Sequence, residues 1–308
     1  MVAKSILRKF VLAPALLAGL LLALGAIPAF SAAGGSIHQA NGSAVIGYSI
    51  DSDVTGQLWA VDLNTGVATP VGPTGFRDIE SLSFSAAGVL YGVDQASSSL
   101  VTCDVTTGGC TAVGALGVGV VDTGLAFDDS GNLWMSTDKP APATFYKLDP
   151  TTGAATAIGL QGQEVTGLAF GNGVLYGLGG DSKDNLVTVN RATGAATPVG
   201  ALGAVSLVDG GIDFDGQGVL WGINDRSAGP GNPSQIFTIN RATGAATLVT
   251  AVVDGSSNPL RGFESLAIWP FEEEEEEPFV PEPGTILLLG SGLMGLIGYA
   301  TLRRRAAN

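Results

Sequence analysis

A Thr-Gly turn followed by a short β-prone segment recurs five times along the middle of this 308-residue chain. The copies read NTGVATPVG, TTGGCTAVG, TTGAATAIG, ATGAATPVG and ATGAATLV. Their turn glycines are Gly66, Gly108, Gly153, Gly194 and Gly244, so successive copies begin 41 to 50 residues apart. Self-similarity at this period indicates a repeat architecture, and the repeat length is typical of one blade of a β-propeller.

Three further segments recur inside each repeat. The first is exemplified by SLSF at Ser81 and GLAF at Gly124, the second by LYGVD at Leu90, and the third by LVTCD at Leu100. Such short β-branched or aromatic runs, separated by Gly, Asn and Asp turns, predict four antiparallel strands per repeat. Because no apolar stripe with a 3.6-residue spacing occurs here, we expect an all-β domain.

The two ends of the repeat region complement each other. The N-terminal unit supplies Val45–Asp51, Leu58–Asp62 and Val67–Gly72, which match the second, third and fourth strands but lack a first. The missing first strand is found as Glu264–Trp269. Residues 45–269 therefore predict a five-bladed propeller, closed by pairing of N- and C-terminal strands so that no sheet edge is left open. A six- or seven-bladed ring and a solenoid that does not close are the alternatives.

The N-terminus has the three parts of a secretory signal peptide. Lys4, Arg8 and Lys9 precede a leucine-rich apolar stretch, and small residues follow at Ser31–Ala33. This pattern predicts a removable signal peptide over residues 1–33, followed by a lead segment over 34–44. A retained N-terminal anchor is the alternative.

The C-terminus predicts a membrane anchor. An acidic, proline-containing linker over 270–280 includes the run Glu272–Glu277, which we interpret as a solvated spacer. An apolar helix over 285–302 would span about 27 Å, enough for the hydrocarbon core of a bilayer. The three basic residues that follow place the end of the chain in the cytoplasm: Arg303, Arg304 and Arg305.

This tail resembles a known sorting signal. Pro281, Glu282 and Pro283, the apolar helix and the terminal arginines are similar in order to the PEP-CTERM signal of Gram-negative bacteria, over residues 281–308. The resemblance implies exosortase and the membrane as partners. The chain would be exported, held at the periplasmic face by its C-terminal helix, cut near the tripeptide, and passed to the cell surface or an extracellular polysaccharide matrix. A plain single-span anchor is the alternative.

The repeats resemble bacterial extracytoplasmic propellers of the NHL or YVTN type, over Val45 to Trp269. In those proteins a GLAF-like strand lines the central channel. The resemblance implies architecture only and identifies no activity.

Composition excludes several kinds of chemistry. The chain has a formal charge of -14, one histidine (His38) and two cysteines, which argues against nucleic-acid binding and against His/Cys zinc or multi-histidine metal centres. We therefore predict no catalytic residues and expect the propeller to act as a structural or binding module at the cell surface. The alternative is a carbohydrate-active enzyme, a glycoside hydrolase that uses carboxylates on the propeller face.

One acidic residue lies just before, or at the start of, each predicted innermost strand. These residues are Glu80, Asp122, Glu164, Asp209 and Glu264. If they converge around one mouth of the channel, their mutual repulsion and oxygen ligands favour a hard cation such as Ca²⁺, and no other cofactor is predicted. The alternative is that these carboxylates cap the amides of nearby loops.

Two smaller features concern individual blades. Cys103 and Cys110 flank one hairpin turn, and export to an oxidising compartment permits a disulfide between them. Aliphatic-aromatic pairs such as Leu133-Trp134 and Leu175-Tyr176 recur once per blade. We expect these aromatic rings to pack between blades, with stacking on sugars as the alternative.

Overall fold

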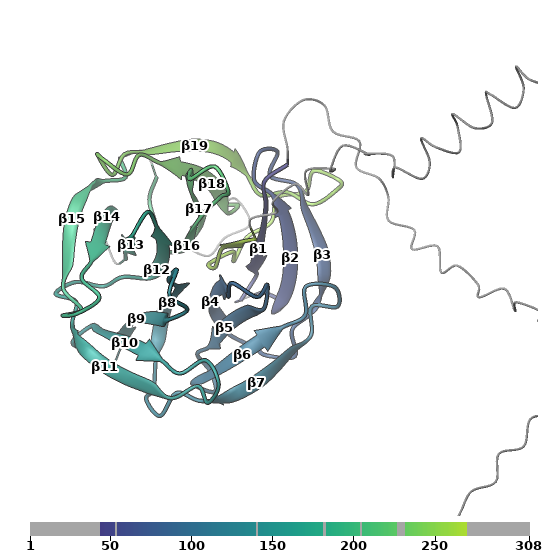
Figure 1. The fold of residues 1–308 in the computed structure, drawn as a ribbon. Coiled ribbons are helices and arrows are strands. Elements are labelled where there is room, and N and C mark those ends of the chain that lie inside the picture. Colours follow the sequence, from purple (N-terminus) through teal and green to yellow (C-terminus); the bar gives the residue numbers. More distant parts are fainter. Residues whose placement is uncertain are drawn as a thin grey trace, which may run out of the picture. The chain divides into compact units, whose positions relative to one another are not determined.

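The recurring segments form the strands of five antiparallel sheets arranged around a central axis, as Figure 1 shows for the computed structural model. The structure describes residues 44–269, apart from 53, 140, 181–182, 204 and 227–231. Within this part every sheet has four strands, so the predicted five-bladed propeller is confirmed. No helix among these residues is long and apolar enough to cross a membrane. The predicted signal peptide, the acidic linker and the sorting signal with its helix over 285–302 lie outside the described residues.

The four strands of each blade follow one another from the axis to the periphery. From the innermost to the outermost strand, the closing blade contains β20 (Ala267–Ile268), β1 (Ile46–Ile50), β2 (Gln57–Asp62) and β3 (Ala68–Pro73). In the same order, the next contains β4 (Ile79–Phe84), β5 (Leu90–Asp94), β6 (Ser99–Cys103) and β7 (Cys110–Ala115). The third contains β8 (Val121–Phe127), β9 (Leu133–Lys139), β10 (Thr144–Leu148) and β11 (Ala155–Leu160). The fourth contains β12 (Gly167–Gly171), β13 (Val174–Gly179), β14 (Asn185–Val189) and β15 (Ala196–Ala201). The fifth contains β16 (Asp209–Phe214), β17 (Leu220–Asp225), β18 (Gln235–Ile239) and β19 (Ala246–Ala251).

The ring closes where the two ends of the repeat region meet. β20 pairs antiparallel with β1, with Gly47 opposite Ile268 and Tyr48 opposite Ala267. The backbone N–H of Ile50 also donates to Ser265 Oγ at 3.2 Å. The closing blade thus gains the innermost strand that its N-terminal part lacks, as the sequence predicted.

The hydrophobic core lies between the blades. For example, Leu178 and Leu186 of the fourth blade pack in one cluster with Ile212 and Phe237 of the fifth. The innermost strands face the axis and each packs against the innermost strands of the neighbouring blades. Removing apolar side chains of this size from water stabilises a fold by about 1.5–3 kcal/mol each, so the interfaces between blades are the main source of stability.

The glycines of the repeat motif hold neighbouring blades together at the periphery. Gly108 has a φ of 81°, and a side chain there would place its Cβ 2.7 Å from the Cα of Gly72 in the preceding blade. Beside this contact, the backbone N–H of Cys110 donates to Thr74 O at 2.9 Å. We call each such contact, with its hydrogen bond, an inter-blade clasp. The equivalent hydrogen bonds elsewhere are Ala68 N to Val253 O, Ala155 N to Leu116 O, Ala196 N to Gln161 O and Ala246 N to Leu202 O.

Candidate functional site

Small residues let the innermost strands approach one another at the axis. Ser81 Oγ and Thr123 Oγ1 of neighbouring strands are 2.9 Å apart, and a side chain on Gly211 would collide with the backbone of Ser265 and Leu266. A cavity of only about 10 Å³ remains among them, room for one water or ion. The axis is therefore nearly filled, and the two mouths of the propeller are separate sites.

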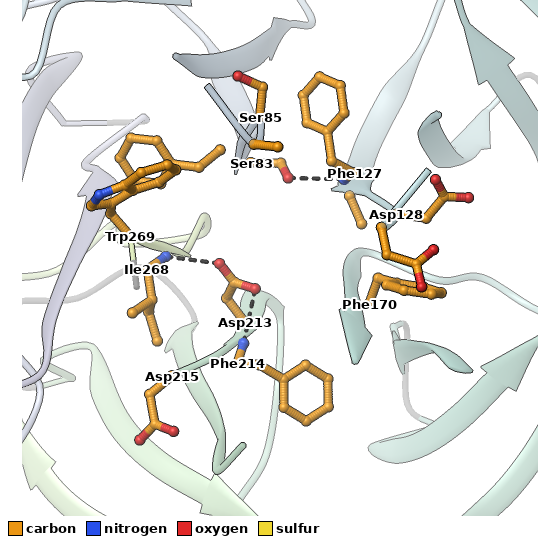
Figure 2. Close-up of a pocket in the computed structure, with 14 residues that line it drawn as sticks. Ser83, Ser85, Phe127, Asp128, Phe170, Asp213, Phe214, Asp215, Ile268 and Trp269 are labelled. Carbon is orange, nitrogen blue, oxygen red and sulfur yellow. Dashed lines mark hydrogen bonds between the residues drawn. The ribbon is translucent and has the colours of Figure 1, made fainter. Parts of the chain in front are cut away.

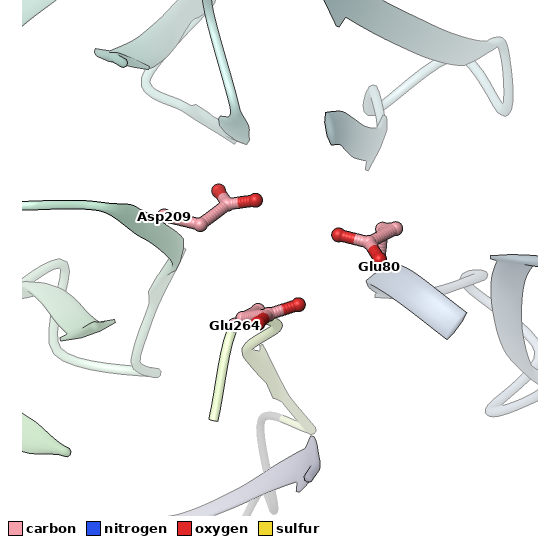
Figure 3. A group of neighbouring side chains, drawn as sticks. All are labelled: Glu80, Asp209 and Glu264. Atoms are coloured by element: carbon pink, nitrogen blue, oxygen red, sulfur yellow. The ribbon is translucent and has the colours of Figure 1, made fainter. Parts of the chain in front are cut away.

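At one mouth the structure brings together three of the five predicted carboxylates. Oxygens of Glu80, Asp209 and Glu264 all lie within 4.8 Å of one another, and the three residues are 5%, 8% and 5% exposed. Their carboxylates point toward a common centre in Figure 3. We call these three residues the acid cluster. Asp122 and Glu164 are not part of it, although the charge of Asp122 helps to raise the pKa of Asp209.

Backbone geometry distinguishes two of the five positions. Glu80 is the extra residue of a bulge between Ile79 and Ser81, whereas Asp122 has a positive φ of 47°. These local conformations aim the side chains in different directions although the residues occupy similar places in the repeat.

Burial and mutual repulsion change the charge of the acid cluster. Burial, together with the charges of Glu264 and Asp209, raises the pKa of Glu80 to about 12. Burial also raises the pKa of Asp209 well above its usual value. Glu80 therefore keeps its proton at neutral pH unless a cation takes the place of that proton. A set of carboxylate oxygens suits a hard cation.

Other acids at the ends of the second strands have structural roles. Asp51 accepts hydrogen bonds from Gln57 N at 2.7 Å and from Thr55 Oγ1. Asp94 accepts from Ser97 N at 2.8 Å, and Asp225 from Gly262 N at 3.1 Å. These three acids therefore cap the amides of nearby loops, the role that was the alternative for the five predicted acids.

The opposite mouth contains a cavity of about 700 Å³ that was not predicted from the sequence (Figure 2). We call it the mouth pocket. It is lined by an aromatic residue from the end of each innermost strand: Phe84, Phe127, Phe170, Phe214 and Trp269. The sequence contained a signal for this aromatic lining, because SLSF, GLAF and GIDF all end in phenylalanine.

The aromatic residues of the second strands support these rings from behind. Tyr48 packs edge-on against Phe84 with ring centroids 5.6 Å apart, and Tyr176 packs in the same way against Phe214 at 5.7 Å. Each pair joins neighbouring blades. The recurring aromatic residues of the second strands therefore pack between blades, while the rings at the ends of the first strands line the pocket.

Two hairpin turns bring carboxylates to the mouth pocket. Asp128 accepts hydrogen bonds from Trp134 Nε1 at 2.9 Å and from Arg191 Nη1 at 2.7 Å. Burial by itself would raise the pKa of Asp128, but the hydrogen bonds from Trp134, Asn132 and Arg191 lower it to about 2. Asp215 accepts from Trp221 Nε1 at 2.8 Å in the equivalent turn of the fifth blade.

Asp213 departs from the repeat. Its Oδ1 accepts a hydrogen bond from Phe214 N and its Oδ2 accepts one from Ile268 N, both at 2.8 Å. Burial raises the pKa of Asp213 to about 7 against the opposing effect of these two bonds. In the β4 blade the equivalent Ser83 accepts from Phe127 N at 3.0 Å, so both side chains bind the backbone of the neighbouring innermost strand.

The two cysteines lie opposite each other at the ends of β6 and β7, and their Cα atoms are 4.0 Å apart. The structure places them in a disulfide. This bridge joins the two outer strands of the second blade beside an inter-blade clasp.

Residues 279–305 match the PEP-CTERM protein-sorting motif. The chain carries a PEP-CTERM sorting motif. The match includes Pro281, Glu282 and Pro283 and extends to Arg305, close to the predicted 281–308. This motif implies an exported protein that associates with the membrane and is recognised and processed by exosortase.

No curated protein matches this chain. Among solved structures, a nidogen/laminin complex aligns with 73% of this chain and 84% of its own, at 12% identity and a TM-score of 0.46. A protein of unknown function from Bacteroides thetaiotaomicron aligns at 20% identity and a TM-score of 0.44, over 57% of this chain and 52% of its own. A gluconolactonase from Xanthomonas campestris aligns at 14% identity and a TM-score of 0.41, over 72% and 85%.

Proposed function

We propose that the propeller of this exported chain is a carbohydrate-binding module and that the mouth pocket is its ligand site. The observation that carries the proposal is a cavity of about 700 Å³ in which aromatic rings and carboxylates occur together. Ligand sites in proteins are typically concave, largely apolar and supplied with a few well-placed polar groups.

The lining suits the surface of a sugar. A pyranose ring has apolar C–H faces that pack on aromatic rings and hydroxyl groups that need hydrogen-bond partners. Phe127 and Trp269 offer rings, while Asp213 and Ser83 offer oxygen atoms. The carboxylate of Asp213 is already oriented by two backbone N–H groups, so its position requires no rearrangement on binding.

The sorting motif supports the same proposal from another direction. A chain exported and processed by exosortase meets its ligands outside the cytoplasm, where polysaccharides of the cell surface and matrix are abundant. A propeller that binds such a polymer would attach the processed protein to it. We propose binding without turnover, because the two pocket carboxyl groups with shifted pKa values are both held by hydrogen bonds from the protein. Asp213 accepts from two backbone N–H groups, and Asp128 accepts from Trp134 and Arg191. A glycosidase needs its two carboxyl groups to act on the substrate.

The test is the affinity of the full chain for a panel of neutral and charged oligosaccharides, measured by titration calorimetry. We expect Phe127→Leu, which keeps an apolar side chain, and Trp269→Ala to weaken binding about tenfold or more. Leu160→Ala, at a residue that is 58% exposed on β11 and does not line the pocket, is the matched control. Absence of binding, or equal affinity in all variants with unchanged thermal unfolding, refutes the proposal. Shorter sugars appearing on chromatography would show that the chain is an enzyme.

We propose Ca²⁺ as the ligand of the acid cluster, a second and separate site. What supports this is the convergence of three buried carboxylates within 4.8 Å, which would supply oxygen ligands and lose their repulsion on binding a divalent cation. Ca²⁺ at 100 times its Kd should then stabilise the full chain by about 2.7 kcal/mol. An unchanged melting temperature in millimolar Ca²⁺ would refute the assignment.

A further inference from the structure

We infer that the sugar recognised by the mouth pocket is an amino sugar with a free, protonated amine. This inference rests on the proposed carbohydrate binding and specifies its ligand. It stands on the charge of the lining, on how the chain's own cations are held at this mouth, and on the position of Asp213.

The lining of the mouth pocket is acidic. Its ionisable members are Asp128, Asp129, Asp213 and Asp215, and among the described residues no lysine, arginine or histidine lines it. Of the four, Asp128 is compensated by Arg191 at 2.7 Å. Even with Arg191 and Arg241 beside it, the four carboxyl groups give the pocket an excess of negative charge, which attracts a cation and repels the carboxylates of a uronic acid.

The rim of the pocket already shows how it holds a cation. The guanidinium of Arg191 binds Asp128 Oδ2 and also lies 4.8 Å from the ring centroid of Phe170. Arg241 lies 5.5 Å from the ring centroid of Phe214. At Arg191 a carboxylate beside a phenylalanine ring thus binds positive charge by an ion pair and a cation–π contact, and at Arg241 a phenylalanine ring does so by a cation–π contact.

Asp213 offers such a carboxylate inside the pocket. Figure 2 shows its carboxylate between Ile268 and Phe214, directed into the space that the aromatic residues surround. Each of its two oxygens accepts one backbone hydrogen bond, which leaves further lone pairs for a ligand. An ammonium group would donate to these oxygens and also compensate their charge, whereas a neutral hydroxyl only donates.

The aromatic rings together with the carboxylate of Asp213 favour some sugars over others. A neutral sugar packs on the aromatic rings but leaves the half-buried carboxylate of Asp213 uncompensated, and N-acetylation of an amine removes its charge while keeping the ring. We therefore expect a free amine to bind about tenfold or more tightly than the same sugar with an acetylated amine, because charge-assisted hydrogen bonds are about twice as strong as neutral ones.

The experiment compares short ligands of equal length on the full chain by calorimetry: a glucosamine trimer, its N-acetylated form, a β-1,4-linked glucose trimer and a uronic acid trimer. Asp213→Ser installs the residue that the β4 blade has at this position, where Ser83 still binds the neighbouring strand. It should abolish the preference for the free amine with little loss of stability. Asp254→Asn, in a surface turn after β19 that does not line the pocket, should leave the preference intact.

Each outcome separates the inference from the proposed function. Equal affinity for the free and acetylated trimers overturns the amino-sugar inference but leaves carbohydrate binding standing. No binding by any sugar overturns both. A preference for the amine that survives in Asp213→Ser, or disappears when Glu272–Glu277 are replaced by glutamine, places the cation outside the pocket and overturns the inference.

Discussion

Replacing Glu80 by glutamine should make the protein more stable at about pH 8 and flatten its stability between about pH 5 and pH 8. Glutamine keeps the size and hydrogen-bonding capacity of the protonated side chain but does not ionise. Glu80 is 5% exposed, and its pKa is raised from 4.5 to about 12 by burial and by the neighbouring carboxylates.

The sign and size follow from proton linkage. Between pH 4.5 and about 12 the folded chain binds a proton at Glu80 that the unfolded chain releases, so this contribution is complete below pH 4.5 and falls as the pH rises. One such group changes the free energy of unfolding by about 1.4 kcal/mol per pH unit, or at most about 4 kcal/mol from pH 5 to 8. Asp209 and Asp213 change it in the same direction, because their pKa values are also raised.

The assay is urea unfolding of the full chain at three pH values across this range, with a chelator present so that no divalent cation occupies the acid cluster. Wild type should lose stability as the pH rises, and Glu80→Gln should lose clearly less. Asp104→Asn, at an exposed turn residue whose pKa is lowered by hydrogen bonds from Thr106, should follow wild type. Parallel pH profiles for wild type and Glu80→Gln would show that the buried carboxyl is not held protonated and would refute the reasoning.

Three further predictions concern the blades. Gly153→Ala should destabilise the chain by about 2–4 kcal/mol, because Gly153 has a φ of 81° and its Cβ would lie 2.8 Å from the carbonyl carbon of Gly114; Gly131→Ala, at a φ of 77° with open space around it, should cost only about 1–2 kcal/mol in the same thermal melts. Replacing the disulfide by the residues of the fourth blade, Cys103→Val with Cys110→Ala, should cost at most about 2.5 kcal/mol, since the cysteines are only seven residues apart; loss of folding would show a larger role. Asp128→Asn should cost about 1–2 kcal/mol at neutral pH and little near pH 2, because a pKa lowered to about 2 contributes stability above pH 3.8 that disappears as the pH falls through 2; an equal loss at both pH values in denaturant titrations would contradict this.

The fold could be predicted from the sequence because the residues that form the inter-blade clasp recur in each of the five repeats. The glycine of each Thr-Gly turn needs both a positive φ and space for the neighbouring backbone, so it cannot vary freely. The absence of a first strand at the N-terminus and its presence at Glu264–Trp269 indicated how the ring closes. Both inferences depend only on which segments recur, which a single sequence displays.

The sites were harder to predict because they depend on directions that a repeat does not reveal. The sequence placed five acids near one mouth, but the bulge at Glu80 and the positive φ at Asp122 separate positions that look equivalent. Similarly, alternation along a strand cannot tell whether Phe214 faces the next blade or an open cavity. Two departures from the repeat at the mouth pocket were visible in the sequence: Asp213, which replaces alanine or serine of the other GLAF-like strands, and Ile268, which replaces their phenylalanine.

The strand that closes the propeller has a mechanical consequence. β20 has only two residues, pairs with β1 through Gly47–Ile268 and Tyr48–Ala267, and is the last strand among the described residues that precede the sorting motif. Tension transmitted through an attached tail therefore reaches the molecule at a pair of strands joined by only two residue pairs. The neighbouring blades share that load through the hydrogen bond from Ile268 N to Asp213 and the contact of Trp269 with Phe84. Cutting the tail removes this tension, so after processing no force from the membrane anchor would act on the strand that closes the propeller.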